Sequence, residues 1–367
     1  MKKSELRIGL ALSGGGMRAA VFHLGILKWM AEHQLMKQVA HTSTVSGASL
    51  CMGLIYACNE NQWPQDTTFL ERVLPQIEQR ITGIDIQWHA LLRLLMQPYY
   101  WGKKANLLAN VMEKRWGIQG TMQNVSKKPM WTVNTTCFET GKDFRISMSR
   151  MGEHDSSYVM HPAFKVSHAM AASAGFPVLI GPYKLKTHRY TWVDTSGTIT
   201  VRPRDEILHL WDGGVYDNMG LDPLFLIDND GELSSDINYL IVSNACGTID
   251  HKKRKLTMPV ENLKRMLDIS QNQVESLKSR SVKDYIQRKQ NGLYIRIGDT
   301  VEDILKSLDT PDAQQLRRKA MNSASVVRAA EYKITLEKMP TEDYHRILRH
   351  GYELMEASWL RYACMDL

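Results

Sequence analysis

A serine in a turn of small residues is the first candidate for covalent chemistry. The stretch VAHTSTVSGASLCMG, residues 39–53, begins like a buried strand and turns around Ser49. A nucleophilic serine at a sharp strand-to-helix turn needs small neighbours two residues before and after it. Gly47 fills the first position, and Cys51 stands at the second, where glycine is expected. Ser49 is therefore either a nucleophile or a serine that caps a helix.

A glycine-rich turn, SGGGMRAA at residues 13–20, is the second candidate. Backbone N–H groups at the start of a helix can bind an anion. A nucleotide phosphate would fit Gly14, Gly16 and Ala19 as G-x-G-x-x-A, but that fingerprint also needs an acidic residue at the end of the next strand. That strand ends in Thr-Val-Ser at residues 44–46, and no G-K-[ST] sequence is present. Both nucleotide interpretations are therefore disfavoured.

The other anion that fits the glycine turn is an oxyanion. If Ser49 attacked an ester carbonyl, the amides of Gly14, Gly15 and Gly16 would stabilise the negative charge on the tetrahedral intermediate. This interpretation explains the serine turn and the glycine turn together.

A third stretch, WDGGVYDNMG at residues 211–220, supplies a base. Asp212 follows an apolar, strand-like segment and precedes a glycine turn, from which its carboxylate could take the proton of Ser49 directly. The alternative is an aspartate that bonds its own turn backbone. The usual histidine base has candidates too, none of them in a distinctive motif: His161, His168, His188 and His209.

The elements around these stretches predict a parallel sheet. Residues 7–12 and 39–46 read as buried strands, and residues 17–33 and 50–58 have helical spacing of apolar side chains. A β-α-β-α order places both turns at the carboxyl edge of the sheet. Further along, we expect a β-hairpin over residues 130–148, a buried strand at residues 238–243 and an amphipathic core-packing helix at residues 341–362.

The stretch IQWHALLRLLMQPYYWGKK, residues 86–104, allows two interpretations. The favoured one is an amphipathic helix that covers the core. The other is a lid or membrane-facing helix, because leucine, tryptophan and tyrosine precede a pair of lysines. A basic run, HKKRK at residues 251–255, is expected to be a solvated loop.

Composition limits the remaining possibilities. The 367 residues carry 46 basic and 39 acidic side chains, a net charge of +7 that suits an anionic membrane surface or nucleic acid without proving either. The five cysteines form no C-x-x-C pair, which argues against a zinc site or a disulfide framework and favours a reducing cytoplasm. We expect neither a signal peptide nor a transmembrane helix, so membrane contact would be peripheral, at the inner face.

Four motifs, in this order, resemble the patatin-like phospholipases: Gly14-Gly15-Gly16-x-Arg18, Gly47-x-Ser49, AASAGFPVLIGPY at residues 171–183, and Asp212-Gly213-Gly214. The resemblance covers residues 6–247. It implies a three-layer α/β sandwich with a mainly parallel central sheet, helices on both faces, and extra C-terminal helices. We therefore expect a catalytic core over residues 1–250, with a helical insertion at 60–125, and a helical C-terminal extension over 251–367.

The resemblance also implies a reaction. Ser49 becomes the nucleophile, Asp212 its base, and Gly14, Gly15 and Gly16 the oxyanion donors, with no metal and no cofactor. Gly47, Gly213 and Gly214 become turn glycines. Arg18 would steer a phosphate or pair with a carboxylate.

The expected activity is hydrolysis of the acyl esters of phospholipids or lysophospholipids at a membrane surface, with no nucleic acid polymer as partner. Some patatin-like proteins act in bacterial antiphage systems, where a cyclic nucleotide activates membrane degradation, and the basic run at residues 251–255 would suit such an activator. The alternatives are a catalytically weak sensor module and an esterase for other esters.

Overall fold

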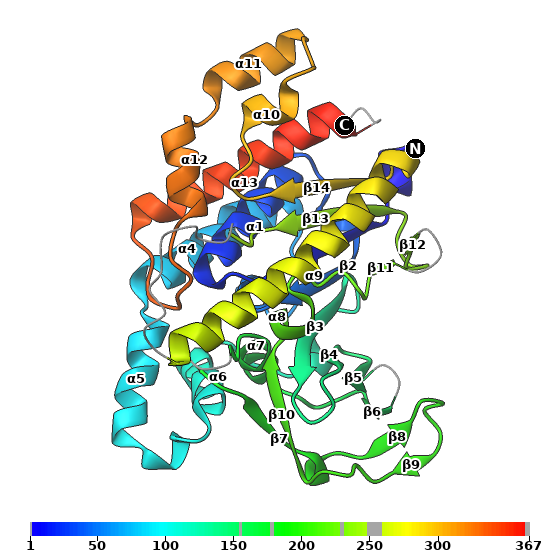
Figure 1. The fold of residues 1–367 in the computed structure, drawn as a ribbon, viewed down its shortest axis with the longest axis vertical. Coiled ribbons are helices and arrows are strands. Elements are labelled where there is room, and N and C mark those ends of the chain that lie inside the picture. The colour runs from blue at the N-terminus through cyan, green and yellow to red at the C-terminus, as the bar shows by residue number, and fades with distance from the viewer. Residues whose placement is uncertain (1, 154–155, 177–179, 228–230, 248–258, 364–367) are drawn as a thin grey trace.

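The fold is built on one large sheet (Figure 1). The computed structural model describes residues 2–153, 156–176, 180–227, 231–247 and 259–363. The main path of the sheet has the strand order β14-β13-β1-β2-β3-β4-β5-β6-β8-β9, and β10 joins it by pairing with β3 and β7.

Five neighbouring strands of this sheet are parallel. They are β14 (Gly292–Arg296), β13 (Tyr239–Asn244), β1 (Ile8–Leu12), β2 (Val39–Val45) and β3 (Met130–Cys137). All residues of β1 and β13 are buried, as expected for strands with a layer packed on each face.

The rest of the sheet is antiparallel. It contains β4 (Asp143–Ile146), β5 (Arg150–Glu153), β6 (Ser157–Met160), β7 (Tyr183–Lys186), β8 (Trp192–Asp194), β9 (Thr200–Val201) and β10 (Ile207–Asp212). The expected hairpin over residues 130–148 corresponds to β3 and β4. A separate small sheet pairs β11 (Phe225–Leu226) with β12 (Glu232–Leu233).

Helices cover both faces of the sheet. Leu10 and Leu12 of β1 belong to the core shared with α1 (Gly16–Glu32) and α13 (Thr341–Tyr362). Ala11, between them, points into a second core that includes Val282 of α9 (Pro259–Lys289). The expected α/β fold, with a mainly parallel central sheet and helices on both faces, is thus confirmed.

The described chain contains further helices besides these three. They are α2 (Gly47–Ala57), α3 (Asp66–Thr68), α4 (Leu74–Gly83), α5 (Ile86–Met96), α6 (Lys104–Arg115), α7 (Val166–Ser173), α8 (Gly214–Asp217), α10 (Val301–Leu305), α11 (Pro311–Lys319) and α12 (Ser323–Ala330). Short helical turns complete the chain, including η4 (Pro98–Tyr100) and η6 (Thr187–Arg189).

Helices α1 and α13 touch backbone to backbone. A Cβ atom on Gly25 would lie 2.0 Å from the carbonyl oxygen of Leu348, and one on Gly351 would lie 2.2 Å from that of Phe22. Glycine at both positions therefore permits the contact. The core-packing helix expected at residues 341–362 corresponds to α13, and its Tyr344 and Trp359 are buried in the main core.

The C-terminal segment is more than a helical extension. Residues 292–296 form β14, which pairs in parallel with β13 and extends the central sheet. The helix α9 lies between β13 and β14 in the sequence, and its described part covers one face of the sheet. A boundary at residue 250 therefore divides the central sheet rather than separating two bodies. The basic run at residues 251–255 lies outside the described residues.

The helix α5 does not cover the core with its apolar stripe. Trp88, Leu95 and Met96 are 55%, 68% and 71% exposed, whereas Ile86 of the same helix is buried.

Within the described residues, no helix combines the length and apolarity needed to cross a membrane. The four cysteines in the described part of the chain are free and buried: Cys51, Cys58, Cys137 and Cys246.

We predict that Gly25→Ala destabilises the protein by about 1–3 kcal/mol, because the new methyl group would collide with the backbone of α13. Urea unfolding at equilibrium measures this change. The matched control is Gly83→Ala at the end of α4, where a Cβ atom would meet nothing within 4 Å. Equal unfolding midpoints for the two variants would contradict the proposed close contact.

Candidate active site

Two strands meet end to end at the candidate site. The last residue of β2, Val45, pairs with Asn134 of β3, and the last residue of β10, Asp212, pairs with Thr135. Strand β4 already pairs with β3 at Thr135, on the other edge. Strands β2 and β10 therefore approach each other along one edge of β3, and the residues at their ends are brought together.

Ser46 occupies the sharp turn that follows β2. Its φ of 50° and ψ of −114° are unusual for a residue with a side chain, and such strain is typical of functional sites. Thr44 and Ala48, two residues away on each side, are small. A Cβ atom on Gly47 would lie 2.1 Å from the carbonyl oxygen of Gly16, so only glycine allows the serine turn and the glycine turn to touch.

The carboxylate of Asp212 faces Ser46. The Ser46 side chain lies close enough to this carboxylate to lower its pKa, and Oδ1 of Asp212 accepts the N–H of Gly214 at 2.8 Å. Asp212 is only 3% exposed, whereas Ser46 is partly exposed. Burial raises the pKa of Asp212 to about 6, although the hydrogen bond from Gly214 and the nearby Ser46 side chain lower it. A buried carboxylate beside a serine hydroxyl is a chemically suitable proton acceptor.

Ser49 lies elsewhere, one helical turn further into α2. Its hydroxyl is fully buried and bonds Thr44 and Ser173, each at 2.9 Å. The hydroxyl of Ser173 donates to the carbonyl of Asn134, so Ser49 must donate to Ser173. The structure therefore brings Asp212 to Ser46, not to the expected Ser49. Cys51 is a buried core residue of α2.

Ser173 links the two strand ends. Its hydroxyl accepts the backbone N–H of Ser46 at 2.9 Å, which holds the strained turn in place. Its neighbour Gly175 accepts the N–H of Asp212 through its carbonyl at 3.2 Å. The small-residue stretch from Ala171 thus has a structural purpose, because its described part supports both candidate catalytic residues. Residues 177–179 of that stretch lie outside the described residues.

The glycine turn places its amides beside Ser46. The N–H of Gly14 donates to the carbonyl of Asn218 at 3.0 Å and is therefore occupied. Gly15 and Gly16 have φ values of 138° and 62°, which favour glycine. Within the described part of the chain, their two amides have no hydrogen-bond partner. Of the three expected oxyanion donors, these two are free.

The guanidinium of Arg18 is buried, and its two terminal nitrogens donate hydrogen bonds to backbone carbonyls. It donates to Ala330 at 2.7 Å, to Tyr332 at 3.2 Å and to Ala245 at 3.0 Å. It therefore meets neither of the two expected partners, a phosphate or a side-chain carboxylate, in this structure. Burial lowers its pKa. Arg18 anchors the segment between α12 and α13 to the start of α1.

That segment reaches the glycine turn itself. The carbonyl of Thr335 accepts the N–H of Met17 at 3.0 Å, and the backbone of Thr335 lies against Gly16. The next side chain toward the N-terminus, Ile334, is 65% exposed. The first turn of α1 is thus partly closed by a segment more than 300 residues away in the sequence.

The turn glycines after Asp212 are explained by the same crowding. A Cβ atom on Gly213 would lie 2.4 Å from the carbonyl oxygen of Asn134, and one on Gly214 would lie 2.6 Å from Oδ1 of Asn218. Neither the D-G turn nor the strand end would keep its position with larger residues. Asp212 does accept a bond from its own turn, as the turn interpretation expected, while it also lies beside Ser46.

Two of the four histidines considered as bases have other bonding partners. Nδ1 of His168 lies 2.6 Å from the hydroxyl of Tyr183, and Nδ1 of His209 lies 2.6 Å from Glu139. Burial lowers the pKa of His168 to about 4. His161 and His188 lie outside the strand junction, after β6 and in η6. Among the described residues, no cluster of three or more His, Cys, Asp or Glu side chains could hold a metal ion.

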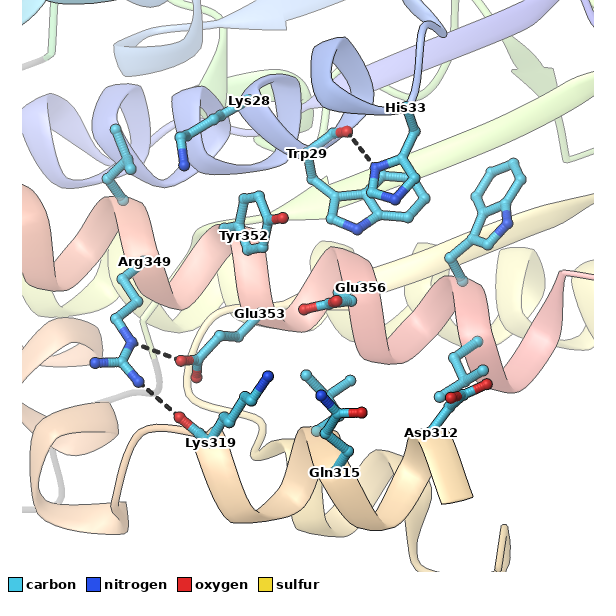
Figure 2. A pocket seen from close by; sticks show the side chains of 14 residues that line it. Lys28, Trp29, His33, Asp312, Gln315, Lys319, Arg349, Tyr352, Glu353 and Glu356 are labelled. Carbon is cyan, nitrogen blue, oxygen red and sulfur yellow. Dashed lines mark hydrogen bonds and ion pairs between the residues drawn. The ribbon is translucent and has the colours of Figure 1, made fainter. Parts of the chain in front are cut away.

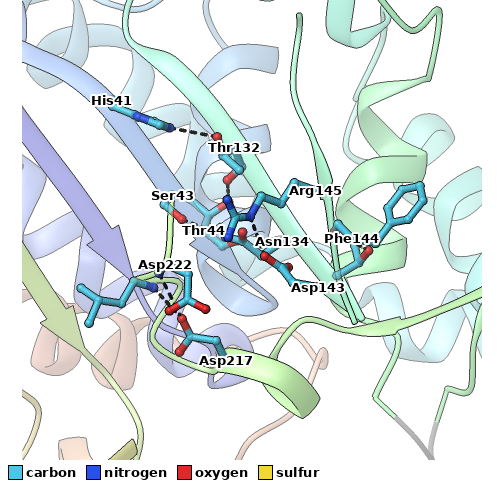
Figure 3. A network of polar contacts seen from close by, with 12 residues as sticks. His41, Ser43, Thr44, Thr132, Asn134, Asp143, Phe144, Arg145, Asp217 and Asp222 are labelled. Atoms are coloured by element: carbon cyan, nitrogen blue, oxygen red, sulfur yellow. Dashed lines mark hydrogen bonds and ion pairs between the residues drawn. The ribbon is translucent and has the colours of Figure 1, made fainter. Parts of the chain in front are cut away.

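A polar network supports the loop that follows Asp212 (Figure 3). The ammonium of Lys278 pairs with Asp217 at 3.1 Å and also with Asp222. Asp217 accepts the N–H groups of Met219 and Leu221. Lys278 comes from α9, so this ion-paired cluster joins the helix to the loop at the end of β10. It is support for the site rather than part of it.

Two cavities of the described structure lie away from Ser46. One, of about 740 Å³, is lined by residues of α1, α11 and α13, including Trp29, Tyr352 and Glu356 (Figure 2). The other, of about 340 Å³, is lined by His41, Arg145 and neighbouring residues. Because His41 and Met130 belong to the amino-terminal parts of β2 and β3, this cavity lies toward the sheet end opposite the strand junction.

We predict that Asp212→Asn raises the free energy of unfolding at pH 8 by up to about 3 kcal/mol. The carboxyl has a pKa of about 6 when folded and an ordinary value of 3.8, so the folded state binds the proton more tightly. The wild type therefore loses stability as the pH rises from about 4 to about 6, and an uncharged amide escapes that loss. Each pKa unit is worth about 1.4 kcal/mol.

Urea unfolding at pH 4 and pH 8 measures this effect. Asp312→Asn, at an exposed position on α11, is the control and should show no comparable gain. An Asp212→Asn protein that is less stable than the wild type at pH 8 would contradict the assigned burial cost.

Comparisons with known proteins show which family this chain resembles in sequence. A family model for patatin-like phospholipase matches residues 10–225, more than half of the chain. Over 192 residues the sequence is 26% identical to the triacylglycerol lipase SDP1L of Arabidopsis thaliana, a match that covers 49% of this chain and 20% of the lipase. This chain thus matches only about a fifth of that relative's length.

Solved structures share the fold at low sequence identity. Human GIVD cytosolic phospholipase A2 aligns with a TM-score of 0.54 and 10% identity, over 96% of this chain and 61% of the phospholipase. The same human enzyme in complex with methyl gamma-linolenyl fluorophosphonate aligns with a TM-score of 0.50 and 13% identity, over 97% and 57% of the two chains. From the family match and the motifs that the fold brings together, the chain belongs to the patatin-like phospholipase family.

Proposed function

We propose that this protein is a serine hydrolase that cleaves the acyl esters of lipids, with Ser46 as nucleophile and Asp212 as base. The observation that carries the proposal is the meeting of these two residues at the junction of β2 and β10, where the Ser46 side chain is close enough to lower the pKa of Asp212. The strained backbone of Ser46 supports it as well, because it holds the hydroxyl at the tip of a turn.

The proposed reaction has two halves. Asp212 takes the hydroxyl proton as the oxygen of Ser46 attacks the ester carbonyl, and the tetrahedral intermediate collapses when the alcohol leaves with that proton. Water then attacks the acyl-enzyme, giving one proton to Asp212, which returns it to the oxygen of Ser46. The products are the free fatty acid and the alcohol or lysolipid.

The amides of Gly15 and Gly16 are the proposed oxyanion donors. Both have free N–H groups at the start of α1, where the helix dipole also favours negative charge. Gly14 instead shapes the turn, because its own amide is occupied and its backbone lies against the Cβ of Ser46.

The proposed substrates are phospholipids or lysophospholipids. The names of the family and of the human phospholipase A2 motivate this choice. The Arabidopsis relative is called a triacylglycerol lipase, so neutral lipid esters are the second candidate. Comparing hydrolysis of phosphatidylcholine vesicles, emulsified triacylglycerol and short-chain esters separates the substrate classes.

A cyclic-nucleotide activator and an antiphage role are further hypotheses, and binding titrations with cyclic oligonucleotides test the activator.

We predict that Ser46→Ala abolishes ester hydrolysis, with a loss of about 10³-fold or more, while Ser49→Ala retains most of the activity. Ser49→Ala instead costs about 1–3 kcal/mol of stability, since it removes two buried hydrogen bonds, one to Thr44 and one to Ser173. Release of fatty acid or of a chromogenic alcohol measures the activity of both variants.

A fluorophosphonate probe identifies the nucleophile directly. The wild type and Ser49→Ala should be labelled, and the labelled peptide should carry the probe on Ser46, whereas Ser46→Ala should not react. Circular dichroism shows whether all three proteins fold. Labelling of Ser49, or full activity in Ser46→Ala, would refute the proposed dyad.

The pH dependence distinguishes Asp212 from a histidine base. Because burial raises the pKa of Asp212 to about 6, and the unprotonated form is the base, kcat/KM for a soluble ester should rise with pH through about 6 and then level off. A base with the lowered pKa of His168, about 4, would keep full activity at pH 5. Activity that does not fall between pH 7 and pH 5 would exclude Asp212.

A further inference from the structure

An ordered helix carries the densest group of exposed apolar side chains in the described chain. Of the 21 large apolar side chains that are exposed there, seven lie within residues 88–101. Five of them share one face of α5 at spacings of three and four, and we call them the α5 stripe: Trp88, Leu91, Leu92, Leu95 and Met96. Tyr99 and Trp101 continue it into the following turn. A contiguous exposed patch of this kind marks an interaction surface.

The stripe is exposed although the helix itself is firmly held. Ile86 and Leu94, on the inner side of α5, pack against the main core. The indole N–H of Trp101 donates to the carbonyl of Leu94 at 3.0 Å, which folds the turn back onto the helix. Figure 1 shows α5 along an outer edge of the molecule, joined to α6. The apolar face is therefore a fixed feature, not a helix that has come loose from the core.

Basic side chains surround the turn between α5 and α6. The ammonium of Lys103 lies 3.9 Å from the ring centroid of Tyr99. The ammonium of Lys184 lies near Gly102, because the amide of Asn106 bonds the backbone of Lys184 and joins α6 to β7. Lys103, with Lys186 and Arg189, lowers the pKa of the exposed Tyr99. These positive charges therefore lie together around Tyr99, at the end of the α5 stripe.

The stretch from α5 to the start of α6 adds no negative charge to this surface. Residues 86–104 contain no Asp or Glu, while Arg93, Lys103 and Lys104 contribute three positive charges. A helix with tryptophan and leucine on one face, tyrosine at the turn and cations around its end is complementary to an anionic lipid surface. A protein partner would need no such segregation of apolar and cationic groups.

We propose that α5 and η4 form a docking site for anionic membranes, with the α5 stripe inserted among the acyl chains and Lys103, Lys184, Lys186 and Arg189 at the headgroups. This deepens the proposed function, on which it rests for the reason to dock, since a lipid hydrolase must reach esters in a bilayer. Docking itself is a physical property that can be measured without catalysis.

The docking site is joined to the candidate active site by hydrogen bonds. The carboxamide oxygen of Gln87, in the first turn of α5, accepts the hydroxyl of Thr335 at 3.1 Å and the N–H of Leu336 at 3.2 Å. Thr335 also accepts the N–H of Met17 beside the glycine turn. The exposed Ile334 lies against Gly16. The lipid surface contacted by α5 thus begins close to the proposed oxyanion donors.

The experiment measures co-sedimentation of the Ser46→Ala protein with vesicles, so that the lipid is not consumed. One set of vesicles is phosphatidylcholine alone, and the other is equimolar phosphatidylcholine and phosphatidylglycerol. Leu95→Ser and Lys186→Glu are introduced separately. The matched controls are Leu226→Ser in β11, 57% exposed, and Lys306→Glu, exposed after α10. Figure 1 shows β11 on the opposite side of the molecule from α5 and α10 at its upper end.

We expect the anionic vesicles to bind the protein more tightly than the neutral ones, and high salt to weaken that binding. Leu95→Ser should lower partition by about tenfold, because a fully buried leucine contributes about that factor. Lys186→Glu should lower it roughly tenfold on anionic vesicles only. The two control variants should bind like their parent.

Equal binding by Leu95→Ser and Leu226→Ser would overturn the proposal. So would a Leu95→Ser variant that binds vesicles normally but no longer self-associates in sedimentation velocity, since the stripe would then be an interface between two copies. If the wild type cleaves soluble esters but binds no vesicles, docking fails and the proposed function stands. If it binds vesicles through the stripe but cleaves no ester, docking stands and the proposed function fails.

Discussion

The meeting of two strand ends on one edge of β3 is the constraint on which the site depends. β2 runs parallel to β3 and β10 runs antiparallel to it, so Ser46 and Asp212 leave their strands facing each other. Crowding at this junction then dictates the residues nearby. Gly47 must be glycine because it touches the backbone of Gly16, and Gly213 because it touches Asn134. The motif glycines are therefore consequences of one packing geometry.

The junction is costly to fold, and the surrounding layers offset that cost. A non-glycine residue at positive φ costs about 1–3 kcal/mol, and the buried carboxylate of Asp212 adds a further penalty at neutral pH. Against this stand the fully buried strands β1 and β13 and the close contact between α1 and α13. The hydrogen bond that the Ser173 hydroxyl accepts from the N–H of Ser46 then holds the strained turn in one conformation. The stabilising contacts thus lie away from the candidate catalytic residues, whereas the destabilising strain and buried charge lie at the strand ends.

Sequence patterns predict the periodic elements well and the site only to within one helical turn. The strand at residues 130–137 and the helix at 341–362 have the expected bounds. The nucleophile shifts from Ser49 to Ser46 in our proposal because the expected strand extended through residue 46, whereas β2 ends at Val45. Both serines have small neighbours, and only the backbone angles and Asp212 distinguish them. β14 is short and surrounded by helical sequence, and periodicity cannot tell whether an apolar stripe such as that of α5 faces the core or the solvent.

The segment between α12 and α13 gives the C-terminal part of the chain a place in the chemistry. Arg18 holds this segment through the carbonyls of Ala330 and Tyr332, and Thr335 accepts an amide from the first turn of α1. Gln87 of α5 binds the same segment from the other side. A displacement of α5 must therefore strain or break bonds that lead to the glycine turn. Because α13 follows directly and is packed backbone to backbone on α1, the segment is also fixed at its far end.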